Sequence, residues 1–174
     1  MGFSFTFRQV ESSPDVGKVI DFISSQPLKY PRYDLWVQKT ESELLASQKR
    51  GILALSDGRV VGDLIYQDHK TLAGFLELKN LRVHPKFRVR EFARFMLRQV
   101  EVQARESHYA VICDVRPERR DVVSFLSSCG YTPVLEGPLY DPNTSDISFV
   151  KPLRKSQEKK VLVVSRSYLE KNML

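Results

Sequence analysis

The run Tyr109–Val115 (Tyr-Ala-Val-Ile-Cys-Asp-Val) places the strongest constraint on how this chain can fold. Its apolar residues are nearly continuous instead of alternating with polar ones, which predicts a strand buried on both faces. Strands of this kind occur in parallel or mixed sheets whose two faces are covered by helices. We therefore predict an α/β fold with this strand inside the sheet.

The segment before this strand has the pattern of another strand, a turn and a long helix. Pro85 ends the predicted strand Phe75–Val83, and we expect the helix to begin near Val89. Apolar residues at helical spacing mark its buried side, and arginines occupy the other side. The apolar positions are Phe92, Ala93, Met96, Leu97, Val100 and Ala104.

The other segments show either strand or helix periodicity, separated by turn residues. Asp57-Gly58 between two apolar runs predicts a tight hairpin, and Gly130 predicts the end of a helix. The predicted order is β-α-α-β-β-β-α-β-α-β-β. The segments are a strand at Phe3–Phe7, helices opened by Ser13 and Asp34, hairpin strands Gly51–Ser56 and Arg59–Tyr66, a helix Asp121–Cys129, and strands Tyr131–Leu135 and Ile147–Val150.

Charge is concentrated near the C-terminal end of the sequence. The 174 residues carry a net charge of +6, of which +5 lies from Lys151 onward, where seven basic residues stand against two acidic ones. The remainder, at +1, lacks the basic face that nucleic-acid binding requires, so we do not expect a nucleic-acid partner. We interpret residues 1–152 as one domain and residues 153–174 as a basic extension.

Several further protein classes are excluded by composition. No apolar run approaches the ~20 residues of a membrane span, and the first thirty residues lack a secretion pattern. Cys113 and Cys129 are too few for a disulfide framework, and neither has a partner at metal-ligand spacing. We expect a cytoplasmic protein with no membrane partner and no metal.

Two stretches resemble the GNAT superfamily of N-acetyltransferases. The first is Leu78–Ala93, in which a strand ending in Leu-x-Val-His-Pro is followed by the turn Arg-Val-Arg-Glu-Phe-Ala at the start of a helix. The second is Val111–Tyr131, a strand and helix that end in Gly-Tyr. The resemblance covers about residues 3–151 and implies a mixed, mostly antiparallel α/β (α+β) sheet with flanking helices.

The resemblance also implies where acetyl-coenzyme A (acetyl-CoA) would bind. A helix N-terminus offers backbone N–H groups and a positive dipole end to a pyrophosphate, and arginines strengthen such a site. The phosphate turn would consist of Arg88, Val89, Arg90, Glu91, Phe92 and Ala93, and the pantetheine arm would lie along Leu81, Arg82 and Val83. Arg119 is a further phosphate or substrate contact, unless it forms an ion pair with Asp121.

The turn departs from the family pattern at Val89 and Glu91, where members usually have glycine. Glycine lets the backbone approach a ligand closely, whereas Glu91 adds a side chain and a negative charge. Two alternatives remain open for Glu91. Either it opposes the phosphates, or it points away and stabilises the helix N-terminus.

The resemblance implies Glu77 as the general base, because it lies eleven residues before Arg88. Partial burial would raise its pKa toward the useful range, and the alternative is an exposed Glu77 paired with Lys79. Leu126 stands where the family commonly has a tyrosine acid. Tyr131 is our choice of substitute, with Cys129, Tyr140 and solvent as alternatives.

The predicted function is an N-acyltransferase that moves acetyl from acetyl-CoA to a primary amine of a small molecule or protein. The alternative is a GNAT-like fold without turnover that acts as a coenzyme A sensor or protein-interaction module. The apolar run Val161–Val164 predicts that the extension packs, as an added edge strand or against the second copy in a homodimer, with a short helix toward Leu174.

Overall fold

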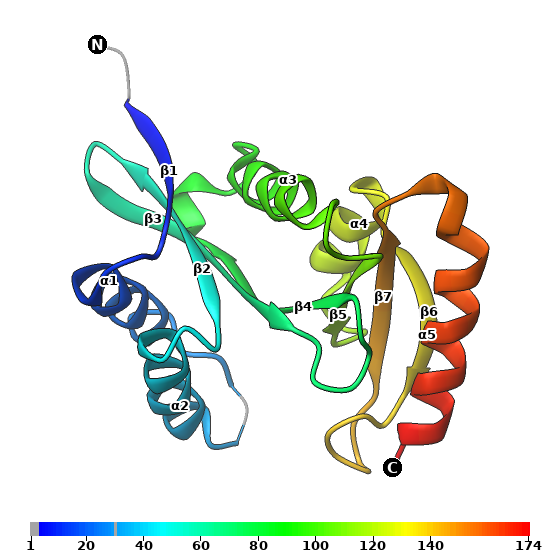
Figure 1. The fold of residues 1–174 in the computed structure, drawn as a ribbon. Coiled ribbons are helices and arrows are strands. Elements are labelled where there is room, and N and C mark those ends of the chain that lie inside the picture. The colour runs from blue at the N-terminus through cyan, green and yellow to red at the C-terminus, as the bar shows by residue number, and fades with distance from the viewer. Residues whose placement is uncertain (1–3, 30) are drawn as a thin grey trace. The chain divides into compact units, whose positions relative to one another are not determined.

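The computed structural model describes residues 4–29 and 31–174. The predicted order of strands and helices is confirmed, with an added C-terminal helix (Figure 1). The elements are β1 (Phe5–Gln9), α1 (Ser13–Ser24), α2 (Tyr33–Leu45), β2 (Arg50–Ser56), β3 (Arg59–Asp68), β4 (Phe75–Val83), the 3-10 turn η1 (Pro85–Phe87), α3 (Phe92–Ala104), β5 (Ala110–Val115), α4 (Arg120–Ser128), β6 (Thr132–Gly137), β7 (Asp146–Pro152), η2 (Lys155–Gln157) and α5 (Glu158–Asn172).

The strands are hydrogen-bonded in the order β1-β2-β3-β4-β5-β7-β6. β4 and β5 pair in parallel, from Phe75 opposite Ala110 to Glu77 opposite Ile112. The pairs β1–β2, β2–β3, β5–β7 and β6–β7 are antiparallel. This is the mixed, mostly antiparallel sheet that the sequence predicted.

The chain forms two compact units. Unit 1 comprises residues 1–67 and 79–100, and unit 2 comprises residues 68–78 and 101–174. β4 and α3 each contribute residues to both units. Phe3, part of the predicted first strand, lies outside the described residues.

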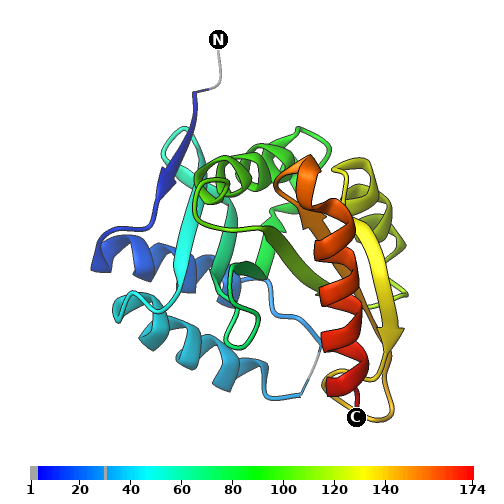
Figure 2. The same ribbon diagram turned by 45° about the vertical axis from the view of Figure 1, so that its right-hand side comes forward.

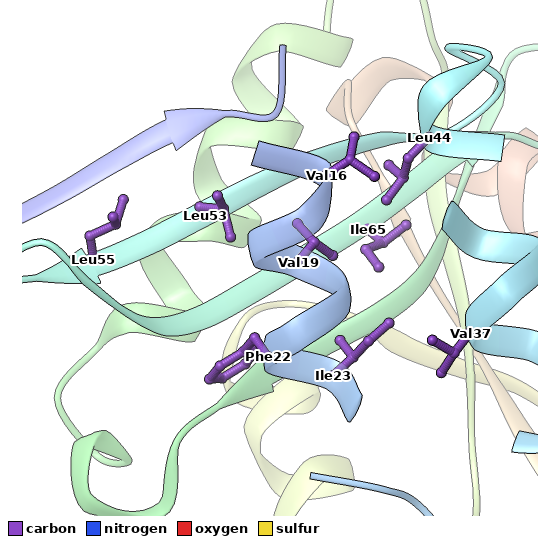
Figure 3. Packing of buried hydrophobic residues seen from close by; sticks show 9 residues of the cluster. All are labelled: Val16, Val19, Phe22, Ile23, Val37, Leu44, Leu53, Leu55 and Ile65. Carbon is purple, nitrogen blue, oxygen red and sulfur yellow. The ribbon is translucent and has the colours of Figure 1, made fainter. Parts of the chain in front are cut away.

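In unit 1, α1 and α2 pack on one face of the β2–β3 hairpin (Figure 3). Val19, Ile23, Leu53 and Ile65 are fully buried at the centre of this core. The Asp57-Gly58 turn has positive φ at both residues, 48° and 78°, as a two-residue hairpin of type I′ requires. The predicted hairpin is therefore confirmed.

In unit 2, β5 has the double-sided burial that its sequence predicted, with Ala110–Cys113 all buried. Gly130 ends α4 with φ of 84°, and the Tyr131 N–H donates to the Leu126 carbonyl oxygen. α5 runs beside β6 and β7 in both ribbon views (Figures 1 and 2).

The structure corrects the predicted start of α3 and excludes one of the two arrangements expected for Val161–Val164. α3 begins at Phe92 instead of Val89, because Val89 and Glu91 adopt left-handed φ values that no α-helix contains. The apolar run Val161–Val164 is helical and adds no strand to the sheet. Burial along α5 follows helical spacing, since Val161, Ser165 and Leu169 are buried at intervals of four residues.

This burial pattern makes a direct prediction for α5. Val161 is 4% exposed and packs in the core of unit 2, whereas Val163 is 68% exposed. Val161→Ala should lower the free energy of unfolding by roughly 1–3 kcal/mol, through lost burial and a small cavity. Val163→Ala, the matched control, should leave it nearly unchanged. Urea unfolding of the two variants measures the difference, and equal losses would contradict this packing.

Candidate active site

The turn between β4 and α3 presents positive charge at the start of a helix. The Arg88 side chain folds back, with Nε donating to the Val83 carbonyl oxygen at 3.2 Å. The Arg90 guanidinium lies 5.4 Å from the centre of the Phe87 ring. Both arginines are exposed, and they stand beside the positive end of the α3 dipole. The turn therefore has the charge that an anionic ligand requires.

The backbone of this turn has the shape of a glycine-containing turn, although it contains no glycine. Val89 has φ of 59° and Glu91 has φ of 63°, both in the left-handed region. This conformation costs a non-glycine residue about 1–2 kcal/mol, and β-branched residues rarely adopt it. The two positions where the family pattern expects glycine therefore keep the corresponding conformation at an energetic cost.

The side chain of Glu91, the residue before α3, forms an ion pair with Arg94 in the first turn of the helix. Its Oε2 atom lies 2.6 Å from Arg94 Nε, an i,i+3 ion pair in the first turn of the helix. This geometry corresponds to the second alternative for Glu91, an acid that stabilises the helix N-terminus. Arg94 offsets the negative charge that Glu91 brings to the turn.

The other predicted cofactor contacts, Leu81, Arg82 and Val83, form the last part of β4, beyond its pairing with β5. The Arg82 side chain is occupied elsewhere in unit 1. Its Nη1 donates to the carbonyl oxygens of Ile23 and Gln26, at 3.2 and 2.7 Å, and to the Tyr33 hydroxyl at 2.7 Å.

Unit 1 also contains a buried carboxyl group that is linked to Arg82 through Asn80. Asp63 on β3 is fully buried, and its Oδ2 accepts a hydrogen bond from Asn80 Nδ2 at 2.5 Å. Asn80 Oδ1 in turn accepts from Arg82 Nε at 2.8 Å. Burial raises the pKa of Asp63 to about 7, although the Asn80 hydrogen bond and the Arg82 charge act in the opposite direction.

Unit 2 contains a group of four polar side chains, three on β4, β5 and β7 and one on the β6–β7 loop. Asp114 is the central group. Its Oδ1 accepts from the Ser148 hydroxyl and its Oδ2 accepts from the Tyr140 hydroxyl, both at 2.5 Å. Asp114 and Ser148 are direct partners in the β5–β7 register. Glu77 is half-buried on β4.

Tyr140 lies within the electrostatic reach of both carboxylates. Desolvation, the charge of Asp114, their hydrogen bond and the charge of Glu77 all raise the pKa of Tyr140 far above its usual range. The hydroxyl therefore stays protonated near neutral pH and acts as a hydrogen-bond donor. Glu77, Asp114, Tyr140 and Ser148 are called the carboxylate cluster below.

Tyr131, the predicted acid, lies in a different part of unit 2. It is only 3% exposed, and burial raises the pKa of its hydroxyl. Lys151 Nζ lies 5.5 Å from its ring and forms an ion pair with Glu101 at 2.6 Å. The Cys129 carbonyl oxygen accepts a hydrogen bond from Lys151 Nζ at 2.7 Å. The structure thus places Tyr131 in a buried polar cluster.

Arg119 forms the alternative ion pair stated from the sequence. Its Nε and Nη2 donate to the two carboxylate oxygens of Asp121, at 3.0 and 2.9 Å. Their hydrogen bond raises the pKa of Arg119 and lowers that of Asp121. Both side chains are about half exposed or more, so the pair leaves Arg119 accessible from solvent.

Residues 4–29 and 31–174 contain no group of three or more His, Cys, Asp or Glu side chains arranged to hold a metal ion. Among the same residues, no helix has the length and apolar character needed to cross a membrane.

Comparison with protein families gives a match over most of the region described above. Residues 18–131 match the model of the Acetyltransferase (GNAT) family. The chain belongs to the GNAT acetyltransferase family. Its phosphate turn and Glu77 both lie within the matched residues. No functionally curated protein matches the sequence.

Solved structures show the same GNAT fold at low sequence identity. A GNAT-family protein from Desulfovibrio desulfuricans aligns with TM-score 0.75 and 16% identity, over 87% of this chain and 100% of its own. The ribosomal-protein-S18-alanine N-acetyltransferase of Escherichia coli aligns with TM-score 0.70 and 16% identity, over 86% and 94%. A Salmonella typhimurium protein solved with its cofactor acetyl-CoA aligns with TM-score 0.67 and 14% identity, over 87% and 95%.

Sequence reasoning on this GNAT chain missed Asp114, Ser148 and Asp63. Asp114 and Asp63 each interrupt an otherwise apolar strand, which is a signal that could have drawn attention to them. A buried carboxyl in a strand costs free energy unless it has a role or a partner. Ser148 gave no such signal, because its importance depends on the β5–β7 register.

The raised pKa of Asp63 predicts a pH dependence of stability. Native Asp63 retains its proton up to about pH 7, whereas the unfolded chain releases it near the ordinary value of 3.8. The folded state therefore binds more protons between these values, and stability falls as pH rises from about 4 to 7. In Asp63→Asn the loss of unfolding free energy over this pH range should be smaller by a few kcal/mol, on the order of 1.4 kcal/mol for each unit of pKa shift.

Urea unfolding at pH 5 and pH 8 measures this effect. Asp21→Asn, an exposed position on α1 in the same unit, is the matched control and should keep the wild-type pH dependence. An unchanged difference between the two pH values in Asp63→Asn would show that Asp63 is ionised in the folded protein at both.

Proposed function

We propose that the protein is an N-acetyltransferase that transfers acetyl from acetyl-CoA to a primary amine of a small molecule or protein. Membership of the GNAT family supports acetyl transfer in general. The observation that carries the more specific proposal is the carboxylate cluster. It combines a half-buried carboxylate, Glu77, with a protonated hydroxyl, Tyr140, at the end of the parallel β4–β5 pairing.

The phosphate turn fits the pyrophosphate of acetyl-CoA. Arg88 and Arg90 are exposed cations next to the N-terminus of a helix of 13 residues, and Glu91 is already paired with Arg94. The left-handed conformations at Val89 and Glu91 support the same fit. Backbone groups of Leu81, Arg82 and Val83 would hold the pantetheine arm, and Arg119 would meet a phosphate or an acidic part of the acceptor.

Acetyl-CoA, when bound, supplies an acetyl group activated as a thioester. Glu77 accepts the proton that the acceptor ammonium must lose before its nitrogen lone pair can form the new C–N bond. As that bond forms, the C–S bond breaks and the thiolate leaves with its electron pair, taking a proton from solvent. Tyr140 donates a hydrogen bond in this region, and we propose it over Tyr131, whose hydroxyl is buried.

Replacing Glu77 tests this chemistry. Glu77→Gln should lower kcat by about 10²-fold or more and remove the acidic limb of the pH–rate profile, because the base is lost. Affinity for acetyl-CoA should stay nearly unchanged. The exposed Glu106→Gln in the same unit is the matched control and should behave as wild type. The assay follows coenzyme A release with spermidine, an aminoglycoside and a peptide with a free N-terminal amine.

Two other results of this assay would each decide a point. An active Glu77→Gln with the wild-type pH profile would show that another group or water removes the proton. Tight acetyl-CoA binding without acetylation of any of these amines would favour the alternative, a coenzyme A-binding module without turnover.

The cofactor site is tested separately by Arg88→Ala/Arg90→Ala. Loss of two charge-assisted contacts should raise the Kd for acetyl-CoA by about tenfold or more, with a larger effect at low salt. Arg98→Ala, an exposed arginine on α3, is the matched control and should change the Kd little. Isothermal titration calorimetry at two salt concentrations measures both, and an unchanged Kd in the double variant would place the pyrophosphate elsewhere.

A further inference from the structure

The residues at the end of α5 are fastened to the segment that carries Tyr140. Met173 packs directly on Gly137, so closely that a Cβ atom at Gly137 would lie 2.1 Å from Met173 Cε. The Leu174 N–H donates to the Pro138 carbonyl oxygen at 3.0 Å. These contacts fix the backbone two and three residues before Tyr140, whose hydroxyl is bonded to Asp114.

The packing of the same loop supports this connection. Leu139, the neighbour of Tyr140, packs against the core cluster of unit 2, which includes Val161 and Leu169 of α5. The β6–β7 loop is thereby held to α5 by apolar packing and by a backbone hydrogen bond. The hydrogen bonds within the loop lie after Tyr140, between Asp141 and Thr144, so the contacts with Gly137, Pro138 and Leu139 are the ones that hold the segment before Tyr140.

A second contact of α5 reaches the turn that precedes Glu77. The Tyr168 hydroxyl accepts a hydrogen bond from Thr71 Oγ1 at 2.6 Å, and its ring packs edge-on against His69 at 5.3 Å. His69 Nδ1 accepts from the Leu72 N–H at 3.0 Å, and the His69 N–H donates to the Phe75 carbonyl oxygen at 2.8 Å. Glu77 follows Phe75 by two residues on β4, so the contacts that hold Phe75 lie next to the base.

We infer that α5 and the two residues that follow it position the carboxylate cluster: Met173 and Tyr168 hold the two segments that carry Tyr140 and Glu77. The effect of this positioning on catalysis rests on the proposed function, whereas its effect on the Tyr140–Asp114 contact does not. Residues 158–174 lie outside the matched family region of residues 18–131, so this arrangement is a property of the chain beyond that region. Met173, Tyr168 and Gly137 act through Tyr140 and Glu77 and touch no reacting atom.

The experiment uses Gly137→Ala, Met173→Ala and the double variant in the full chain. Gly137 has no left-handed φ, so an alanine there is compatible with the backbone and conflicts only with the Met173 side chain. Each single variant should disturb the loop, by displacing or removing Met173. The double variant should be closer to wild type than Gly137→Ala alone, because Met173→Ala removes the atoms that the new Cβ would meet.

The readout is the 19F resonance of Tyr140 in protein labelled with 3-fluorotyrosine, identified by its loss in Tyr140→Phe. In Gly137→Ala it should move toward its position in Asp114→Asn, where the carboxylate acceptor is absent. Leu174→Ala keeps the backbone N–H and alters a side chain that is 66% exposed, so it is the matched control and should leave the resonance unchanged. Melting temperatures establish that each variant is folded.

Kinetics give the second readout. Gly137→Ala and Tyr168→Phe should lower kcat by about tenfold, since a displacement near 1 Å at a reacting group costs up to about 10²-fold, while the Kd for acetyl-CoA stays unchanged. The inference is overturned if the Tyr140 resonance is the same in wild type, Gly137→Ala and Met173→Ala. If the resonance moves as expected but wild type acetylates no amine, the positioning role stands and the proposed function fails.

Discussion

Three residue pairs hold β4 parallel to β5, and the arrangement of the site follows from them. A parallel pair needs a long crossover connection, which here contains η1, the phosphate turn and α3. The pairing stops at Glu77 and Ile112, although both strands continue. The last part of β4 is therefore free of β5 along Leu81–Val83, and Glu77 lies where the ladder ends.

Most of the fold could be predicted because its signals are local. The Asp57-Gly58 hairpin, the continuous apolar strand at Ala110–Val115 and the helix end at Gly130 each depend on neighbouring residues alone. The start of α3 could not be predicted, because propensity gives no reason to expect Val89 and Glu91 in the left-handed region. The edge-strand alternative for Val161–Val164 stayed open because a short apolar run does not distinguish a strand from a helix.

The site was predicted less completely than the fold, for a physical reason. Glu77 and the turn at Arg88–Ala93 could be predicted as site residues because they lie in contiguous stretches that resemble the family. The carboxylate cluster joins residues from separate strands and a loop, and its hydrogen bonds require the β5–β7 register, which places Asp114 opposite Ser148. The spacing of residues along the sequence does not reveal which residue of β5 lies opposite which residue of β7. Arg119 and Glu91 form ion pairs with Asp121 and Arg94, which are near neighbours in sequence, and their roles toward a cofactor stay predictions.

The absence of glycine from the phosphate turn has a consequence for the thermodynamics of ligand binding. Glycine would relax the left-handed conformations, but it would also let the free turn sample many other shapes. Val89 and Glu91 restrict the backbone to far fewer conformations, and the Glu91–Arg94 pair limits it further. When an anion binds this turn, the protein therefore loses less conformational entropy than a glycine-containing loop would lose. The cost of the conformation is incurred during folding, and the turn is preorganised before the ligand arrives.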